Sequence, residues 1–491
     1  MEDINLGEEV DIQSVKQRAI KGVVVLSGRM FLLQIISFLG FFLLTVFLGK
    51  AEIGLFFAIS ELVAILGYFS DIGLAAALIQ KKEKPTVKDI RSTFTIQQIL
   101  VLTLVVLVFI FTPLIRDFYH IEQPGIFLLW ALTISFFLAS LKTIPSVLLE
   151  RKLRFDLLVV VEIAESFLFY GLAVLLAWRG LGVSSYAWAV LLRGIVGVTL
   201  IYFLSPWPLG LAFEKDSLRH LLRFGVPYQA NTFLAVIKDR LMNVFLWKII
   251  GASGVGILGW AQKWAQMPLR FVMDSVMKVT FPAYSRMQDH KEELSKGIEK
   301  TLFFVSLAVF PMLVGILVLA KPLVFLIPKY SKWEVALLAL YLFIINSAFG
   351  ALTTPLTNAL NAIGRIKIVF KLMIMWTVLT WVIYPFLAIK YGANGVALGA
   401  AIVSLSSIVA IWVAKRYLIF NFFKSIIKPT VAAILMGLLI LILGNLLVKN
   451  ILTVLILIMI GSLFYFGLIY TMVGKQFITD AKKLFYAFKN R

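Results

Sequence analysis

The stretch from Gly225 to Arg286 is apolar enough to lie in a membrane, yet it contains nine charged residues. Two of them, Lys248 and Arg286, lie at expected helix ends, and seven lie further inside the expected helices. A basic side chain at the centre of a bilayer costs about 2.5 to 3.5 kcal/mol, so such charges usually face water, a partner or a ligand. Five of the seven are bases and two are acids: Lys238, Asp239, Arg240, Lys263, Arg270, Asp274 and Lys278. An excess of bases inside a membrane segment indicates a site for an anion.

The spacing of these charges predicts where they point. We expect two membrane helices joined by a small-residue turn that begins at Gly251. In the second helix, Lys263, Arg270, Asp274 and Lys278 share one face, because their separations are multiples of a helical turn. That face should line a water-filled cavity or another helix. The alternative is that Asp274 forms ion pairs with the bases four residues away, which would only stabilise the helix.

Further charged residues lie in other predicted spans. Glu162 and Glu165 are three residues apart and so share a face, where they form a proton or sodium site or act as counter-ions for Arg29 or Arg193. We expect Lys142 to extend to the membrane surface. The candidate anion-binding residues are Arg29, Arg193, Lys238, Arg240, Lys263, Arg270 and Lys278. The candidate ion-coupling or gating residues are Glu61, Asp71, Glu162, Glu165, Asp239 and Asp274.

Composition predicts a polytopic all-α membrane protein. Of the 491 residues, 61% are hydrophobic and only 15% are charged. There is no cysteine, and the three histidines are far apart in the chain, so we expect no metal site. We find no nucleotide-binding glycine loop, and we expect no cofactor. The net charge of +21 lies mainly in loops between apolar runs. This distribution is typical of a membrane protein that follows the positive-inside rule, and we expect no nucleic-acid partner.

Apolar runs predict about 14 transmembrane helices between residues 20 and 474, each long enough to cross about 30 Å of hydrocarbon. With that number, thirty Lys and Arg residues fall on the side of both termini and nine on the other side. The positive-inside rule therefore predicts a multi-pass protein of the cytoplasmic membrane with both termini in the cytoplasm.

An internal repeat divides the chain into two halves. Gly49 and Gly54 match Gly251 and Gly256 at one offset, and Pro145 and Gly182 match Pro355 and Gly392 at another. We expect two six-helix bundles related by a pseudo-two-fold axis, plus two C-terminal helices. The predicted segments are an N-terminal segment 1–19, bundles 20–205 and 225–414, a linker 206–224, helices within 425–474 and a basic tail 475–491.

The repeat also pairs two charges. Glu61 in the first half corresponds to Lys263 in the second. Because a two-fold axis places matched positions on opposing walls, we hypothesise that these two side chains approach each other in one conformational state. The alternative is that they never meet.

Three segments carry a resemblance to a known family. Residues 47–83, 222–233 and 279–294, which include FSDIGLAAALIQ, LRFGVPYQANTF and VTFPAYSRMQDH, resemble the bacterial Wzx-type polysaccharide flippases of the multidrug/oligosaccharidyl-lipid/polysaccharide exporter superfamily. The resemblance implies translocation of an undecaprenyl-diphosphate-linked oligosaccharide by alternating access, coupled to H⁺, Na⁺ or the membrane potential. It also implies contact with membrane lipids and, as a candidate partner, the polysaccharide polymerase machinery.

The resemblance gives the charged residues an expected role. Lys238, Arg240, Lys263 and Arg270 would bind a diphosphate or acidic sugars. Trp260, Trp264 and Tyr228 would stack on sugar rings, or else act as interfacial anchors. A multidrug cation antiporter of the same superfamily remains an alternative, although it should favour carboxylates in its cavity. A membrane polymerase or ligase is a second alternative, which the short loops disfavour.

Overall fold

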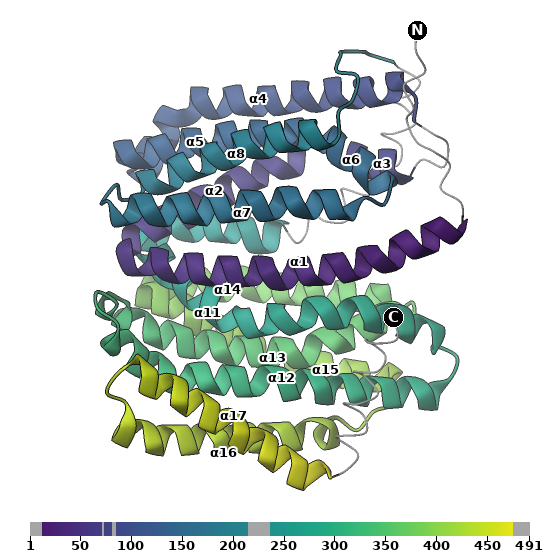
Figure 1. The fold of residues 1–491 in the computed structure, drawn as a ribbon. Coiled ribbons are helices and arrows are strands. Elements are labelled where there is room, and N and C mark those ends of the chain that lie inside the picture. Colours follow the sequence, from purple (N-terminus) through teal and green to yellow (C-terminus); the bar gives the residue numbers. More distant parts are fainter. Residues whose placement is uncertain (1–11, 71–72, 81–84, 215–235, 475–491) are drawn as a thin grey trace. The chain divides into compact units, whose positions relative to one another are not determined.

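The computed structural model describes residues 12–70, 73–80, 85–214 and 236–474, and of residues 12–27, 80 and 237–239 the backbone only. All regular elements in these ranges are helices (Figure 1). Their contacts divide the chain into two units, Met1–Val255 and Gly256–Arg491. The predicted all-α fold is confirmed for the described residues.

The described part of the first unit contains six long helices, two short α-helices and one π-helix. Its elements are α1 (Ile12–Phe47), α2 (Lys50–Ser70), α3 (Leu74–Gln80), α4 (Val87–Tyr119), α5 (Gln123–Leu141), α6 (Thr143–Arg151), α7 (Phe155–Trp178), α8 (Ser184–Leu204) and the π-helix η1 (Val236–Leu241). Helix α7 packs between α1 and α8, and α5 packs on α8, α4 and α2 (Figure 1).

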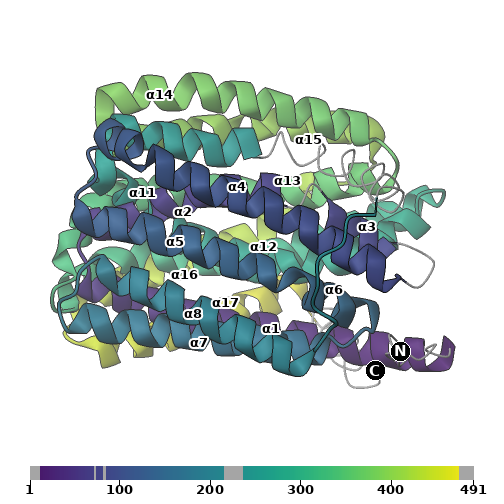
Figure 2. The same cartoon turned by 90° about the horizontal axis from the view of Figure 1, so that it is seen from above.

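Helix α11 (Met242–Arg286) begins in the first unit and continues into the second unit. The elements of the second unit are α11, α12 (Lys291–Leu326), the 3₁₀-helix η2 (Ser331–Ala336), α13 (Leu337–Ala362), α14 (Ile366–Leu405), α15 (Ser407–Tyr417), α16 (Phe422–Leu447) and α17 (Ile451–Val473). Helix α13 lies along α14, and α12 packs on α13 and α16 (Figure 2).

Small residues allow the helices to approach closely. A Cβ atom at Gly40 of α1 would overlap the ring of Tyr170 in α7, and one at Gly437 of α16 would overlap Val314 of α12. The Tyr170 hydroxyl also lies 2.9 Å from the hydroxyl of Ser37. Small residues at such contacts are typical of membrane helices, where packing replaces the hydrophobic effect as the force between helices.

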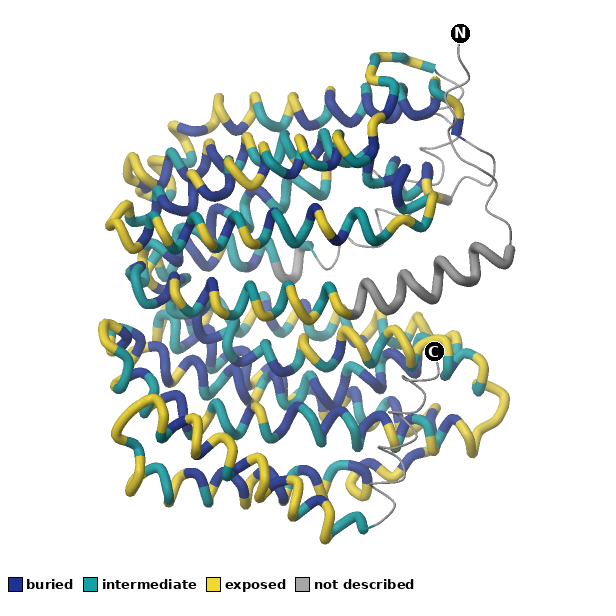
Figure 3. Tube along the Cα trace, viewed as in Figure 1, coloured by how far each residue is buried: buried dark blue, intermediate teal, exposed yellow. Residues whose placement is uncertain are grey.

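The outer helices expose apolar side chains. In α17, Leu452 and Leu463 are 65% and 70% exposed, and many other positions of α4 and α17 are exposed in Figure 3. Side chains of this type would be unfavourable in water over so large an area, so these faces must contact lipid. Twelve candidate membrane spans lie among the described residues.

Two of these spans contain a break at a glycine. Gly251 has φ 69° and ψ 176° within α11, and Gly392 has φ 59° and ψ −137° within α14. An unbroken helix of 45 residues would be about 68 Å long, more than twice the hydrocarbon thickness of about 30 Å, so the breaks separate two passes. The expected turn at Gly251 is therefore present. The count of 14 helices stays a prediction, because residues 225–235 lie outside the described ranges.

The breaks occur at positions that match in the repeat. Gly49, between α1 and α2, corresponds to Gly251, and Gly182, between α7 and α8, corresponds to Gly392. Gly182, like Gly251 and Gly392, has a positive φ, which side chains other than glycine rarely adopt. The two halves thus share the places where the chain reverses. The two-fold axis and the segment boundaries stay predictions.

Replacing Gly251 with alanine tests the break in α11. Its φ and ψ fall in a region open almost only to glycine, so Gly251→Ala should lower the unfolding free energy by about 1 to 3 kcal/mol. Gly171→Ala in α7 is the matched control, because no atom lies within 4 Å of the added Cβ and a helical alanine is favoured by up to about 1 kcal/mol. Thermal unfolding in detergent measures both, and equal melting temperatures would contradict the assignment.

Candidate functional site

An ion pair joins helix α2 to the π-helix η1 in the first unit. Arg240 of η1 donates to the Glu61 carboxylate of α2 over 2.9 Å, and both side chains are partly exposed. A π-helical turn changes the direction of the side chains that follow it, and such turns often occur at functional sites. The sequence singled out both residues but did not pair them. Glu61 and Lys263 belong to different units, so their proposed approach stays a prediction.

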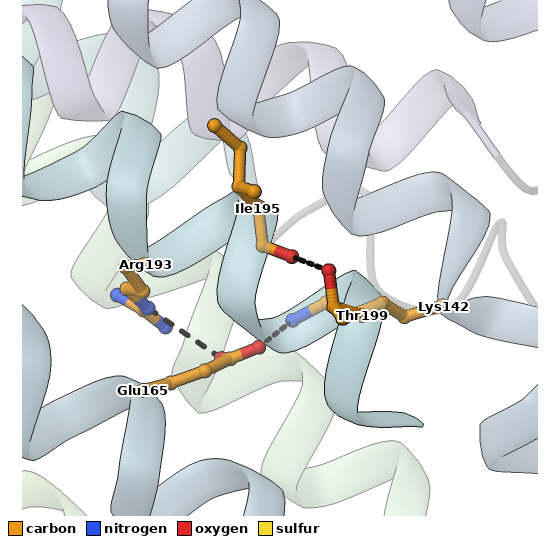
Figure 4. Close-up of polar contacts among 5 residues, drawn as sticks. All are labelled: Lys142, Glu165, Arg193, Ile195 and Thr199. Carbon is orange, nitrogen blue, oxygen red and sulfur yellow. Dashed lines mark hydrogen bonds and ion pairs between the residues drawn. The ribbon is translucent and has the colours of Figure 1, made fainter. Parts of the chain in front are cut away.

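The two carboxylates of α7 each contact bases from neighbouring helices. Glu162 forms an ion pair with Arg29 of α1. Glu165 lies between Lys142, with which it forms a short ion pair, and Arg193 of α8, whose Nε lies 3.5 Å from its Oε2 (Figure 4). Three bases and two acids therefore meet around one face of α7. A role of Glu162 and Glu165 in ion coupling stays a prediction.

The Glu165 carboxylate is the most buried group of this cluster. Its side chain is 6% exposed, against 19% for Lys142 and 46% for Arg193. Gly197 of α8 makes room for it, because a Cβ atom there would overlap the carboxylate. Desolvating a carboxylate costs several kcal/mol unless an opposite charge compensates it. Because Lys142 is closer to Glu165 and more buried than Arg193, we infer that Lys142 supplies most of this compensation.

The expectation that Lys142 extends to the membrane surface is wrong. Lys142 lies at the break between α5 and α6, where its side chain turns inward to Glu165. Pro145 explains the break: proline has no N–H, so the Leu141 carbonyl loses its helical donor. The Tyr202 hydroxyl donates to that carbonyl instead, over 3.0 Å. Pro145, three residues after Lys142, is the sequence signal that could have located this lysine.

The charged face of α11 lies in the second unit, on the far side of the Gly251 break from Arg240. Lys263 is partly buried, whereas Arg270, Asp274 and Lys278 are exposed. Arg270 donates to Gln266 over 3.1 Å. Within the described part of the chain, no ion pair joins Asp274 to either neighbouring base. The structure therefore does not contain the ion pairs of Asp274 that the alternative interpretation of this helix required.

Trp260 is not available to stack on a sugar. It is 2% exposed, it lies parallel to Trp333 with ring centroids 5.3 Å apart, and its Nε1 donates to Tyr330 over 3.0 Å. The sequence interpretation missed this because η2, which supplies Trp333, follows Trp260 by some 70 residues. Trp264 contacts Trp260 edge to face, with ring centroids 6.4 Å apart.

Four candidate residues lie outside what the structure describes. Asp71 and Tyr228 fall in undescribed segments, and for Lys238 and Asp239 only the backbone, within η1, is described. Their expected roles stay predictions. Among the described residues, no group of His, Asp and Glu side chains is arranged to hold a metal ion.

A pair of substitutions tests which base supports Glu165. Lys142→Gln leaves the buried carboxylate with only the more distant Arg193, so it should cost about 3 to 5 kcal/mol of stability. Arg193→Gln removes the same charge from a half-exposed position and should cost about 1 kcal/mol or less. Adding Glu165→Gln should restore most of the stability lost in Lys142→Gln. Melting temperatures in detergent measure these differences, and equal losses in the two single variants would contradict the assignment.

Comparison with known proteins gives the family. Residues 43–337 match the family described as polysaccharide biosynthesis protein. The chain is 26% identical over 371 residues to the lipopolysaccharide biosynthesis protein WzxC of Escherichia coli, which covers 72% of each chain. It is 23% identical over 377 residues to the teichuronic acid biosynthesis protein TuaB of Bacillus subtilis, covering 75% of this chain and 77% of TuaB.

Solved structures show the same fold. The lipid II flippase MurJ in an inward closed conformation superposes with a TM-score of 0.71 at 17% identity, covering 91% of this chain and 98% of MurJ. An inward-facing multidrug resistance transporter of the MATE family gives a TM-score of 0.58 at 20% identity, covering 80% of this chain and 97% of that one. Because the family match covers more than half of the sequence, this chain belongs to the polysaccharide biosynthesis protein family, and it has the fold of MOP superfamily transporters.

Proposed function

We propose that this protein is a flippase that moves an undecaprenyl-diphosphate-linked oligosaccharide across the cytoplasmic membrane by alternating access. The observation that carries the proposal is the basic face of α11, which is formed by Lys263, Arg270 and Lys278 together with Asp274. Three bases and one acid lie along it, and within the described residues the acid pairs with neither base beside it. In a segment this apolar, an excess of bases over acids on one face supports a site for an anion.

A diphosphate suits this face chemically. Its two phosphates accept several hydrogen bonds, and a guanidinium such as that of Arg270 can donate two in parallel. Arg270 is exposed and has a neutral partner, Gln266, so no carboxylate has to be displaced before a phosphate binds. A partly buried lysine such as Lys263 adds charge where screening by water is weaker. The polyprenyl chain would stay in the surrounding lipid.

The ion pairs of the first unit suggest a different role there. Arg29, Arg193 and Arg240 each have a carboxylate partner in the structure. We propose that these pairs set the shape of the first unit, and that a cargo anion competes for the more exposed bases, Arg193 and Arg240, during the cycle. Protonation or sodium binding at Glu61 would release Arg240, and at Glu165 it would release Arg193, which is how an ion gradient could drive the cycle. At Glu162 it would release Arg29.

Family membership weighs against the two alternatives. WzxC and TuaB are named for lipopolysaccharide and teichuronic acid biosynthesis, which fits a polysaccharide precursor better than a drug. A cation antiporter shares the fold, as the MATE structure illustrates, but the basic face of α11 would repel a cationic drug. A polymerase would need a catalytic loop or domain, and apart from residues 205–235 the described helices are joined by connections of a few residues.

Leaflet exchange in proteoliposomes tests the proposal. A fluorescent polyprenyl-diphosphate oligosaccharide should be moved by the intact protein under an ion gradient, and Lys263→Gln/Arg270→Gln should slow it by about tenfold or more, because each lost charge-assisted contact is worth about 1.5 to 3 kcal/mol.

The matched control removes two bases elsewhere. Lys390→Gln/Lys449→Gln lowers the net charge equally but changes residues at helix ends outside the basic face of α11, so the rate should stay near that of the intact protein. Equal rates for the intact protein and the Lys263/Arg270 variant, with both inserted and folded, would show that the basic face of α11 is not the cargo path.

A further inference from the structure

The last third of the chain contains a long acid-free segment. No Asp or Glu occurs between Glu334 and Asp480, whereas ten Lys and Arg residues do. Seven of the ten lie at two turns of the second unit. Arg365, Lys367 and Lys371 are at the start of α14, and Lys415, Arg416, Lys424 and Lys428 are at the end of α15 and the start of α16. We call these seven residues the basic surface.

The structure brings the two turns together. The Arg365 guanidinium lies 5.1 Å from the ring centroid of Tyr417, which is the last residue of α15. All seven bases are exposed, and in the described part of the chain none forms an ion pair with a carboxylate. Glu299 of α12 reaches this region, but it accepts the backbone N–H of Asn421 over 2.8 Å. No carboxylate of the described residues therefore neutralises the basic surface, which leaves it able to attract an external anion.

Aromatic rings hold two of these bases in a defined orientation. The Arg416 guanidinium lies 3.5 Å from the ring centroid of Trp412, and Lys415 lies 6.0 Å from that of Phe423. A guanidinium stacked by its face keeps its N–H edge available for two parallel hydrogen bonds to a phosphate. Trp412 and Phe423 are themselves 55% and 70% exposed, as expected for rings at the level of lipid headgroups.

We propose that the basic surface binds the phosphate headgroups of anionic phospholipids in the adjoining leaflet. Arg365 and Arg416 would hold the phosphate through their free edges, and the lysines would supply additional attraction. The partner is a lipid because the rings that orient the bases are exposed at the ends of membrane helices, where headgroups are the nearest anions. This inference does not depend on which cargo the protein moves.

Site-specific quenching tests the proposal, because the chain has no cysteine and one can be introduced for a label. Ile419→Cys places a fluorophore in the turn between α15 and α16, at a position that is 68% exposed. Ile389→Cys is the matched control. It is 74% exposed and adjoins Lys390, which lies 4.5 Å from the ring centroid of Phe386 but has no further bases around it in sequence. Ile389 lies about 35 Å along α14 from its start beside Arg365, and Arg365 contacts Tyr417 at the end of α15, two residues before position 419.

The labelled protein is placed in phosphatidylcholine nanodiscs with nitroxide-labelled phosphatidylglycerol or phosphatidylcholine as quencher. At position 419, half-maximal quenching should need about tenfold less of the anionic lipid, whereas at position 389 the two lipids should agree within about twofold. Lys415→Gln/Arg416→Gln should remove most of the preference at 419. If that variant does not fold, Arg416→Lys should reduce the preference, because it keeps the charge but loses the planar edge.

Three outcomes would overturn the proposal. The first is equal quenching by both lipids at position 419. The second is the same preference for the anionic lipid at 419 and 389, since that would reflect only the protein's overall positive charge. The third is a preference at 419 that persists in the charge variants.

Discussion

The cost of placing charge in hydrocarbon governs the interior of this protein. A bare carboxylate or ammonium in a membrane span must have an opposite charge, water or a ligand beside it. In the first unit the structure meets this need internally, since Glu61, Glu162 and Glu165 each have a basic partner from another element. On α11 three bases share a face with one acid, and within the described residues that acid pairs with neither neighbouring base. The bases of α11 therefore outnumber the acids on their own face, whereas each of the three acids of the first unit contacts a base.

Breaks in the helices decide which charges can pair. Pro145 removes one backbone donor, and the break that results at Lys142 turns this lysine toward Glu165. The Tyr202 hydroxyl donates to the Leu141 carbonyl that lost its donor. Gly251 separates Arg240, which contacts Glu61, from the basic face of α11. The absence of a side chain at Gly197 leaves space for the Glu165 carboxylate. Local backbone chemistry thus positions groups that lie far apart in the sequence.

Much of the fold could be predicted from the sequence, because apolar runs long enough to span a bilayer have few alternatives to helix. The break at Gly251 and the shared face of α11 also follow from residue type and spacing alone. The pairing of charges was harder to predict. The spacing of Glu162 and Glu165 indicated a common face, and Arg29 and Arg193 were expected as basic partners. Only tertiary packing decides that Glu162 pairs with Arg29 and that Glu165 pairs with Lys142 and Arg193. Trp260 was misassigned for the same reason, since its partner Trp333 comes from a distant short helix.

The charge of the cargo provides the most direct test of the account. Two fluorescent lipids with the same polyprenyl chain and the same oligosaccharide, one linked through a diphosphate and one through a neutral ether, can be compared for leaflet exchange in the same proteoliposomes. If bases inside the membrane spans recognise the cargo, the diphosphate should exchange at least about tenfold faster than the neutral lipid, the difference expected from losing one charge-assisted contact. Equal exchange of the two lipids would contradict the account, because the protein would then recognise the sugar or the polyprenyl chain and the bases would have no part in transport.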